Sequence, residues 1–246
     1  MDVLVFQHIA CEPPGVYEDV LYERGVELHR VEVDAHEPLP SWWSFDAIVA
    51  MGGPMSANDA LPWIEPLCGL LRRAVDARVP VVGHCLGGQL FSRALGGSVT
   101  RSPVPEIGWV DVEAEDESAR AWFGGCSRFT TFEWHYDTFA IPPGARRLLR
   151  NEFVANQAYV VDDLHVGFQC HVEMTDALVR SWCDVARSEL PASSTGNLQS
   201  AADIERDLAG NVRALQQVAG AFYDRWARGL RGVRTNALEL ASIPQA

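Results

Sequence analysis

Residues 83–89 read Gly-His-Cys-Leu-Gly-Gly-Gln, and Cys85 stands where an apolar run meets a helical pattern. The apolar run covers residues 79–82, and the helical spacing follows over residues 89–95. A sharp strand-to-helix turn that carries a nucleophilic side chain is a nucleophile elbow, here with cysteine in place of serine. The flanking glycines are expected to let the backbone take the strained turn. The pattern predicts covalent acyl transfer through the Cys85 thiol.

A cysteine nucleophile needs a base, and the best candidate is His171. Residues 167–173 read Gly-Phe-Gln-Cys-His-Val-Glu, so His171 and Glu173 are two positions apart. In an extended strand end such residues point to the same side. Glu173 would then bind one imidazole nitrogen while the other faces Cys85, which fixes the tautomer and supports the imidazolium. This predicts a Cys-His-Glu triad.

Acyl transfer also needs donors for an oxyanion. The elbow offers the N–H of Leu86, and the Gly-Gly-Pro turn at residues 52–54 offers that of Gly53. The start of the helix favours negative charge, so it is expected to lower the thiol pKa of Cys85. Gln89 lies one helical turn beyond the cysteine, where it is expected to hold the substrate.

No metal or cofactor is expected. His171 and Glu173 would give a zinc ion two ligands, but zinc usually takes three and no third is evident. The six cysteines are scattered without CxxC pairs, which argues against a zinc site or a disulfide framework and favours a reducing cytoplasm. No nucleotide-binding GxxxxGK[ST] motif occurs.

Length and charge limit the classes of protein further. The 246 residues suffice for one sizeable α/β domain or at most two small ones. The formal net charge of −13 disfavours nucleic acid and anionic membranes as partners. The opening residues resemble a first buried strand and not a signal peptide, and no apolar run is long enough to span a bilayer.

Strand and helix patterns alternate along the first part of the chain. Apolar strands are predicted at 3–6, 26–33, 45–51 and 79–82, with helices at 16–24 and 63–78. This alternation predicts a three-layer α/β fold, a mostly parallel sheet with helices on both faces. Ligands of such sheets bind beyond the carboxyl ends of the strands, where Gly53 and Cys85 stand.

The later part changes character. Short, closely spaced strands predict a small antiparallel extension, at 107–112, 128–134, 146–150, 157–161 and 165–170. Thr175 is a plausible N-cap for a helix over 175–190. We therefore expect a catalytic domain at 1–190, then a linker and an amphipathic helix at 191–246. That helix, over 202–230 with a frayed tail after Arg234, packs on its own domain or on a partner, including a homodimer.

These motifs together resemble the class I (triad) glutamine amidotransferases, whose fold is flavodoxin-like. The resemblance rests on residues 51–54, 83–89 and 169–173. Residues 134–139, which read Trp-His-Tyr-Asp-Thr-Phe, resemble the segment that lines the glutamine pocket of that family. The resemblance covers roughly residues 45–175.

The resemblance implies a cysteine-dependent hydrolysis of glutamine to glutamate and ammonia through a γ-glutamyl thioester. Cys85 would be the nucleophile, His171 the acid and base, and Glu173 the residue that orients it. Gly53 and Leu86 would stabilise the oxyanion. Substrate-binding residues would be Gln89, Trp134, His135 and Tyr136.

Three departures from the family pattern leave alternatives open. Val172 replaces a usual proline, His84 replaces a residue that is more often apolar, and Tyr136 stands where glycine is frequent. Because Tyr136 would reshape the pocket, a γ-glutamyl peptidase is an alternative to a glutaminase that supplies a separate synthase subunit. Weaker alternatives are a non-catalytic regulatory subunit and a cysteine peptidase or isomerase on a related sheet.

Overall fold

The computed structural model describes residues 1–35 and 37–241, which form a single nine-stranded sheet. Along the sheet the strands follow the order β2-β1-β3-β4-β9-β8-β7-β5-β6. Their bounds are β1 (Asp2–Gln7), β2 (Glu27–Glu32), β3 (Ala47–Ala50), β4 (Val81–His84), β5 (Val99–Ala114), β6 (Arg128–Phe139), β7 (Arg146–Arg150), β8 (Ala158–Val161) and β9 (His165–Phe168).

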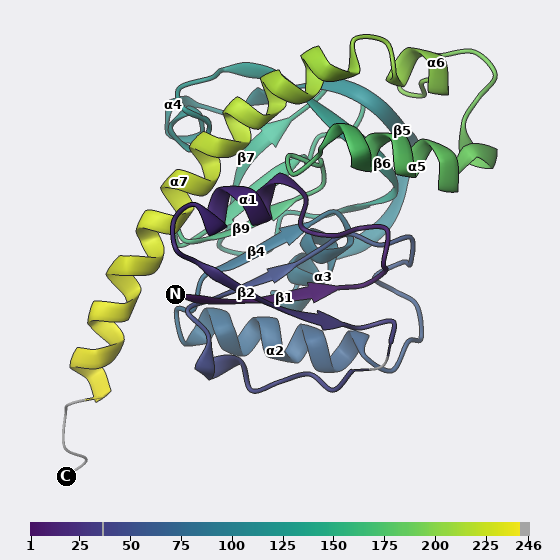
Figure 1. The fold of residues 1–246 in the computed structure, drawn as a ribbon. Coiled ribbons are helices and arrows are strands. Elements are labelled where there is room, and N and C mark those ends of the chain that lie inside the picture. Colours follow the sequence, from purple (N-terminus) through teal and green to yellow (C-terminus); the bar gives the residue numbers. More distant parts are fainter. Residues whose placement is uncertain (36, 242–246) are drawn as a thin grey trace.

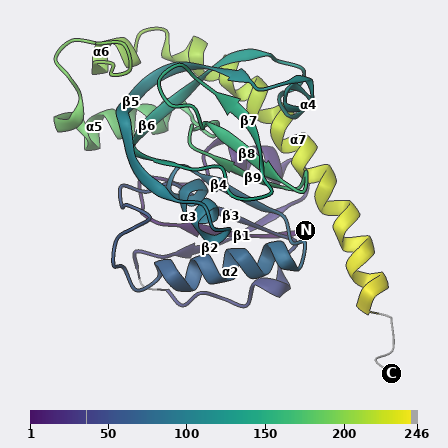
Figure 2. The same cartoon turned by 180° about the vertical axis from the view of Figure 1, so that it is seen from behind.

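Helices cover both faces of this sheet (Figures 1 and 2), which confirms the predicted α/β class. Helices α2 and α3 lie on one face, and α1 and α7 lie on the other. The bounds are α1 (Val16–Tyr22), α2 (Ile64–Asp76), α3 (Leu86–Ala94), α4 (Glu117–Arg120), α5 (Asp176–Val185), α6 (Ala201–Ile204) and α7 (Leu208–Ala241), with short 3-10 turns η1 (Trp42–Ser44), η2 (Ala121–Phe123) and η3 (Arg187–Glu189).

Strand β1 shows why the sheet needs two covering layers. Its side chains alternate between the faces, as the period of two requires: Val3 and Val5 join the core under α1, whereas Leu4 and Phe6 join the core under α2. β1 pairs in parallel with β2 and β3, and β3, β4 and β9 continue the parallel part. A strand buried on both faces is apolar throughout, which is how the sequence reveals it.

The predicted antiparallel extension continues the same sheet through β8, β7, β5 and β6. Strands β5 and β6 are longer than predicted, because β5 begins at Val99 and β6 ends at Phe139. Their register shifts between Arg101 and Glu106, a stretch that contains two prolines. That irregularity breaks the alternation of apolar residues, so the sequence pattern predicts no strand there.

The C-terminal part differs from the prediction in its boundaries. The side chain of Thr175 caps α5 by accepting from the Leu178 N–H, as expected, but α5 ends at Val185. The single helix predicted over 202–230 is two helices, α6 and α7, and Asp207 between them has a φ of 55°. The chain remains helical to Ala241, so the predicted fraying after Arg234 is wrong over the described residues.

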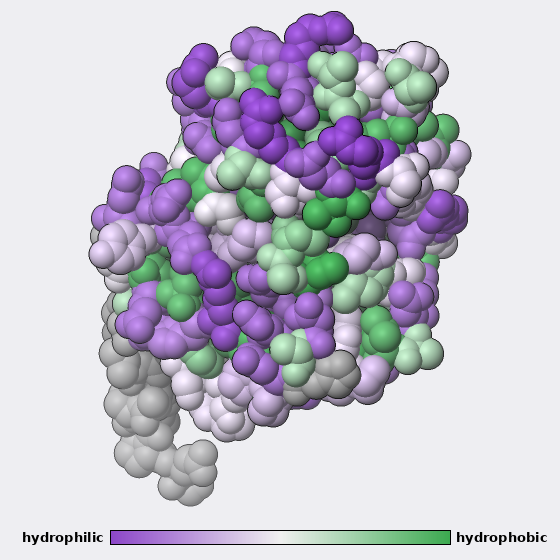
Figure 3. Space-filling view, turned by 45° about the vertical axis from the view of Figure 1, so that its right-hand side comes forward, coloured by the Kyte–Doolittle hydropathy of each residue, from purple (hydrophilic) through white to green (hydrophobic). Residues whose placement is uncertain are grey.

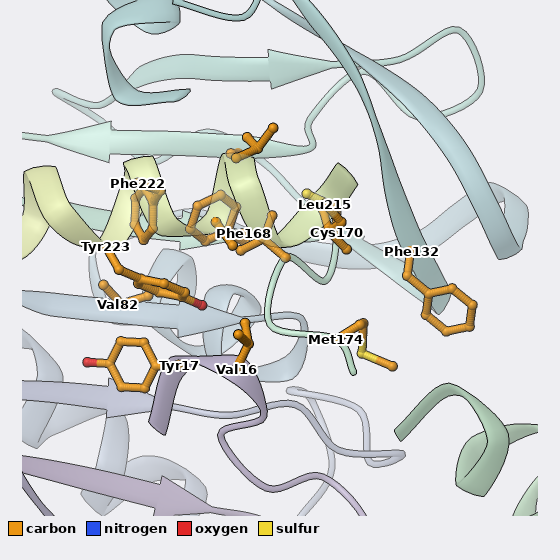
Figure 4. Close-up of a cluster of buried hydrophobic side chains, with 14 of the residues drawn as sticks. Val16, Tyr17, Val82, Phe132, Phe168, Cys170, Met174, Leu215, Phe222 and Tyr223 are labelled. Carbon is orange, nitrogen blue, oxygen red and sulfur yellow. The ribbon is translucent and has the colours of Figure 1, made fainter. Parts of the chain in front are cut away.

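Helix α7 packs into the same core as the sheet. Figure 4 shows Phe222 and Tyr223 of α7 against Tyr17 of α1 and Phe168 of β9. The ring centroids of Tyr17 and Tyr223 are 4.6 Å apart, and those of Phe168 and Phe222 are 4.8 Å apart. The apolar stripe of α7 is therefore covered by its own chain, while the division at residue 190 stays a prediction.

The outer surface is mixed in character. In the space-filling view, hydrophobic side chains are interspersed with hydrophilic ones over the face that is seen (Figure 3). Among the described residues, no helix combines the length and apolar character needed to cross a membrane.

Candidate active site

The strand β4 leads directly into Cys85, and α3 begins at the next residue. Cys85 itself takes the strained conformation, with φ 47° and ψ −108°. The flanking glycines have a different role from the one expected, because neither has a positive φ. A Cβ on Gly87 would stand 2.0 Å from the carbonyl oxygen of Ala50, and one on Gly83 would stand 2.5 Å from that of Gly87. These glycines let α3 approach the sheet closely.

The structure brings Cys85, His171 and Glu173 together at the carboxyl ends of two neighbouring parallel strands, β4 and β9. Nδ1 of His171 lies 2.6 Å from Oε1 of Glu173, and both side chains are buried. The same imidazole interacts with the Cys85 thiol and partly offsets the rise in pKa that burial gives that thiol. The geometry thus gives one imidazole nitrogen to Glu173 and leaves the other, Nε2, for Cys85.

Charges at this site stabilise the imidazolium that His171 becomes when it takes up a proton, beside an ionised Glu173 carboxylate. Burial disfavours both charged forms, but the contacts between the groups outweigh it. The pKa of Glu173 lies well below its usual range because His84 and His171 stabilise the carboxylate. Glu173 in turn raises the pKa of His171 well above its usual value.

The expected lowering of the Cys85 pKa does not occur in this structure. Burial raises the pKa of the thiol, the nearby His171 lowers it in part, and the carboxylates of Glu12 and Glu173 raise it again. The helix start alone therefore does not create a thiolate here. Transfer of the thiol proton to His171 is the step that would activate the sulfur.

The proposed oxyanion donors lie together. Residue Gly53 packs against the elbow, since a Cβ on it would stand 2.8 Å from Cδ2 of Leu86. Within the described part of the chain, the N–H groups of Gly53 and Leu86 donate to no backbone carbonyl. Leu86 is the first residue of α3, where N–H groups have no partner inside the helix. Both N–H groups are therefore free to bind an oxyanion.

A cavity of about 320 Å³ opens beside Cys85. It receives residues from the loops after β1 and β3, from β6 and from the end of α5. The lining includes the predicted residues Gly53, Cys85, Gln89, Trp134, His135 and Tyr136, together with Ile9, Cys11, Glu12, Met55, Arg101, Asp137, Trp182 and Glu189.

Gln89 organises one side of this cavity. Its amide nitrogen donates to the carbonyl oxygen of Asp137 at 3.1 Å and to Oε1 of Gln169 at 3.2 Å. The amide nitrogen of Gln169 lies 3.6 Å from the sulfur of Cys85. Gln169 thus links Cys85 to the pocket wall, a contact that sequence reasoning missed although the residue stands two positions before His171.

The three pocket residues predicted from β6 lie in two different places, two at the rim of the cavity and one inside. Trp134 and Tyr136 donate to the same carboxylate oxygen of Glu189, at 3.0 and 2.9 Å, and form the pocket rim. The guanidinium of Arg101 lies 4.7 Å from the centroid of the Tyr136 ring. His135 points inward: its Nδ1 lies 3.0 Å from the carbonyl oxygen of Asp137, and its Nε2 lies 3.0 Å from a carboxylate oxygen of Glu106. Both imidazole nitrogens of His135 therefore lie within hydrogen-bonding distance of oxygen atoms of the protein.

Comparison with known proteins shows to which family this chain belongs. Residues 16–178 match the family described as glutamine amidotransferase class-I. The chain belongs to that family. The glutamine amidotransferase-like protein YfeJ of Salmonella typhimurium is 31% identical over 229 residues, which cover 88% of this chain and 93% of that protein.

Solved structures agree with this family membership. A glutamine amidotransferase from Methylobacillus flagellatus superposes with a TM-score of 0.89 at 46% identity, covering 93% of this chain and 94% of that one. A further relative is a component of the glutamine-hydrolysing GMP synthase of Sulfurisphaera tokodaii, which is 31% identical over 149 residues. Those residues cover 60% of this chain and 77% of that protein.

One buried cluster near the cavity has ligand atoms close enough for a metal. Glu106, Glu133 and His135 each offer an atom within 4.8 Å of the others. However, Glu106 already accepts hydrogen bonds from Asn151 at 2.7 Å and Gln157 at 2.8 Å, and it lies 3.0 Å from Nε2 of His135. Hydrogen bonds thus explain the buried Glu106 carboxyl without a metal, and the cluster holds His135 against the Asp137 carbonyl.

Two functional candidates, Gln169 and Glu12, were not assigned a role from sequence alone, and a third, His84, was considered only as a neighbour of Cys85 that tunes its thiolate or packs. His84 lies 3.1 Å from Oε2 of Glu173, Gln169 contacts Cys85, and the Glu12 carboxyl faces the cavity. His84 and Gln169 stand within the motifs around Cys85 and His171, which is a signal that could have found them. Glu12 stands in no motif, and its position shortly after the first strand is the signal that could have placed it near the pocket.

Proposed function

We propose that this chain hydrolyses a γ-glutamyl amide, glutamine in the simplest case, to glutamate and ammonia through a cysteine thioester. The observation that carries the proposal is the triad geometry: a strained nucleophile elbow at Cys85 beside a histidine whose Nδ1 lies 2.6 Å from Glu173. Family membership supplies the γ-glutamyl chemistry, which the triad alone would not specify.

The first half of the reaction follows from these positions. His171 accepts the thiol proton of Cys85 on Nε2, and the thiolate attacks the amide carbon of the substrate. The N–H groups of Gly53 and Leu86 bind the oxyanion that forms on the amide oxygen. Glu173 stabilises the imidazolium, which then protonates the leaving nitrogen as the C–N bond breaks.

Water completes the reaction in the second half. His171, now neutral, accepts a proton from a water molecule, which attacks the thioester carbon. The C–S bond breaks and glutamate leaves, and the thiol of Cys85 is restored with the proton from His171. The retention of all three triad members argues against a non-catalytic regulatory role.

A γ-glutamyl peptidase is the second candidate, and the shape of the cavity favours it. The cavity extends past Cys85 toward Trp182, Val185 and Glu189, which leaves room for a leaving group larger than ammonia. The relatives among glutamine-hydrolysing GMP synthases support the other variant, in which ammonia passes to a separate synthase. Homodimer formation and a cytoplasmic location stay predictions.

A substrate assay with purified protein tests the proposal. We expect glutamine or a γ-glutamyl dipeptide to be hydrolysed and Cys85→Ala to abolish turnover, with a loss of about 10⁶-fold, typical of a removed nucleophile. Release of ammonia from glutamine supports the glutaminase, whereas cleavage of dipeptides alone supports the peptidase. Full activity of the Cys85→Ala protein would refute the mechanism. Cys68→Ala is the control because this buried thiol lies outside the cavity.

A further inference from the structure

Three carboxyl side chains line the cavity: Glu12, Asp137 and Glu189. Two of them have hydrogen-bond partners within the protein. Asp137 accepts from the hydroxyl of Ser56 at 2.7 Å, and Glu189 accepts from the indole of Trp134 at 3.0 Å. Both carboxylates therefore stabilise the walls of the pocket.

Glu12 differs from these two. Glu12 is partly exposed, and over the described ranges, 1–35 and 37–241, no donor hydrogen-bonds its carboxyl group. The carboxyl lies beside the reacting groups, as the distances from a hypothetical Cβ on Gly52 show. A Cβ on Gly52 would stand 2.1 Å from Oε2 of Glu12 and 3.3 Å from Cε1 of His171. The carboxyl and the imidazole thus border the same small volume.

This volume lies on the leaving-group side of the site. Trp182 forms its wall, because the indole packs edge-on against His171 with ring centroids 4.8 Å apart and donates to the carbonyl oxygen of Cys11 at 2.8 Å. Gln89 stands with Asp137 on a separate part of the wall, joined to it by a hydrogen bond. A substrate held at Gln89 and attacked by Cys85 would send its leaving nitrogen toward His171.

Resting on the proposed function, we infer that Glu12 forms a subsite for the leaving amine of the γ-glutamyl substrate. The amine, ammonia or a primary alkylamine, would be received there and held as an ammonium ion. A carboxyl that faces the cavity beside a nascent amine, without a hydrogen-bond donor of its own, is suited to this role, since the ammonium would supply an ion pair.

The proton transfers in this step balance. When the tetrahedral intermediate collapses, the C–N bond breaks, its electron pair stays on nitrogen, and the nitrogen takes the proton from Nε2 of His171. The free amine then takes the proton of the Glu12 carboxyl, which leaves an ammonium ion beside a carboxylate. Glu12 regains a proton from water after the ammonium departs.

The protonation of Glu12 in the resting site is consistent with this sequence. Burial raises the pKa of Glu12 to about 7, with Glu173 adding to the rise and His171 opposing it. A carboxyl with such a pKa exchanges its proton near neutrality. An ammonium ion has no lone pair to attack an acceptor, so this role favours hydrolysis over the delivery of ammonia to a synthase.

A matched pair of substrates tests the subsite. L-glutamate γ-methylamide releases methylamine, which becomes an ammonium ion, whereas L-glutamate γ-methyl ester releases methanol, which does not. We expect Glu12→Gln to lower kcat/KM for glutamine and the methylamide on the order of 10²-fold and to leave the ester near the wild-type value. Equal losses on amide and ester, or no loss on either, would overturn the inference.

Two further proteins complete the experiment. Glu189→Gln removes a carboxylate from the same cavity and is expected to change amide and ester hydrolysis in equal proportion. Glu12→Asp keeps the charge on a shorter side chain, so it serves if Glu12→Gln does not fold, and its loss must again be confined to the amides. A wild-type protein that cleaves neither substrate would refute the proposed function itself, whereas normal cleavage by both Glu12 variants would refute only the subsite.

Discussion

Nδ1 of His84 lies 3.1 Å from Oε2 of Glu173, on the carboxylate oxygen that His171 does not use. The residue that precedes the proposed nucleophile thereby contacts the third member of the proposed triad. His84 is fully buried, and its ring stacks on Phe168 at a centroid distance of 5.5 Å. Glu173 is thus positioned by two histidines, one on each side, and both lower its pKa.

Replacement of His84 by Phe is expected to lower kcat/KM about 10- to 100-fold, because loss of a contact to a charged group costs about 1.5–3 kcal/mol. Without His84 the pKa of Glu173 rises, so Glu173 begins to gain a proton at higher pH than in the wild type. The acidic limb of the kcat/KM profile should therefore move to higher pH. His165→Phe, which changes a buried histidine outside the cavity, is the control, and an unmoved limb in His84→Phe would contradict this role.

The side chain of Gln169 should tune the nucleophile. Its amide nitrogen lies 3.6 Å from the Cys85 sulfur, where a donor stabilises a thiolate more than a thiol. We expect Gln169→Leu to shift the pH dependence of Cys85 alkylation by iodoacetamide to higher pH. Counting label on Cys85 by mass spectrometry separates it from label on Cys11 and Cys126, whose side chains are partly exposed. An identical alkylation profile in the variant would show that this contact does not affect the thiol.

Helix α7 should unfold together with the sheet. Phe222 has no exposed surface and packs on Phe168, so Phe222→Ala is expected to lower the free energy of unfolding by about 3–5 kcal/mol. Gln217→Ala, on the exposed side of the same helix, is expected to change it by less than about 0.5 kcal/mol. Denaturant unfolding followed by circular dichroism measures both. Two separate transitions in the wild type would indicate that residues 191–246 fold independently of the sheet.

Two buried histidines should make the protein less stable in acid. Burial lowers the pKa of both His8 and His165 from 6.5 to about 4. Between these values the unfolded chain binds more protons than the folded one, so the stability present above pH 6.5 is lost as the pH falls toward 4. Each histidine contributes a slope of about 1.4 kcal/mol per pH unit in that window.

The variant His165→Leu should remove one of these two contributions. Unfolding free energies at pH 7 and pH 5 should therefore differ less in the variant than in the wild type. His29→Gln is the matched control because His29 lies on the surface strand β2 and is partly exposed. If His165→Leu keeps the full wild-type difference, burial of a neutral His165 does not contribute to acid sensitivity.

Local patterns in the sequence are sufficient to predict the parallel part of the sheet and the elbow. Continuous apolar runs identify strands buried on both faces. A cysteine between such a run and a helix must therefore lie at the turn that joins them. The pair His171 and Glu173 is predictable for the same reason, because a separation of two residues fixes their relative direction in an extended segment.

The antiparallel strands are less predictable at their ends. β5 and β6 extend past the predicted bounds because cross-strand hydrogen bonds continue beyond the irregularity between Arg101 and Glu106. A pattern of side chains cannot reveal such pairing when prolines and polar residues interrupt the alternation. The break at Asp207 escapes prediction for a related reason, since the apolar stripe continues from α6 into α7 across it.

By itself the sequence determined which residues are the candidate nucleophile and base, because both assignments depend on residue type and on spacing within a few positions. Only the tertiary structure decided what surrounds them. His84 reaches Glu173 because β4 pairs with β9, and Glu12 comes near His171 because the loop after β1 brings its carboxyl beside Gly52. Contacts of this kind join residues far apart in the chain, and they are fixed by the pairing of strands and the packing of loops, not by local pattern.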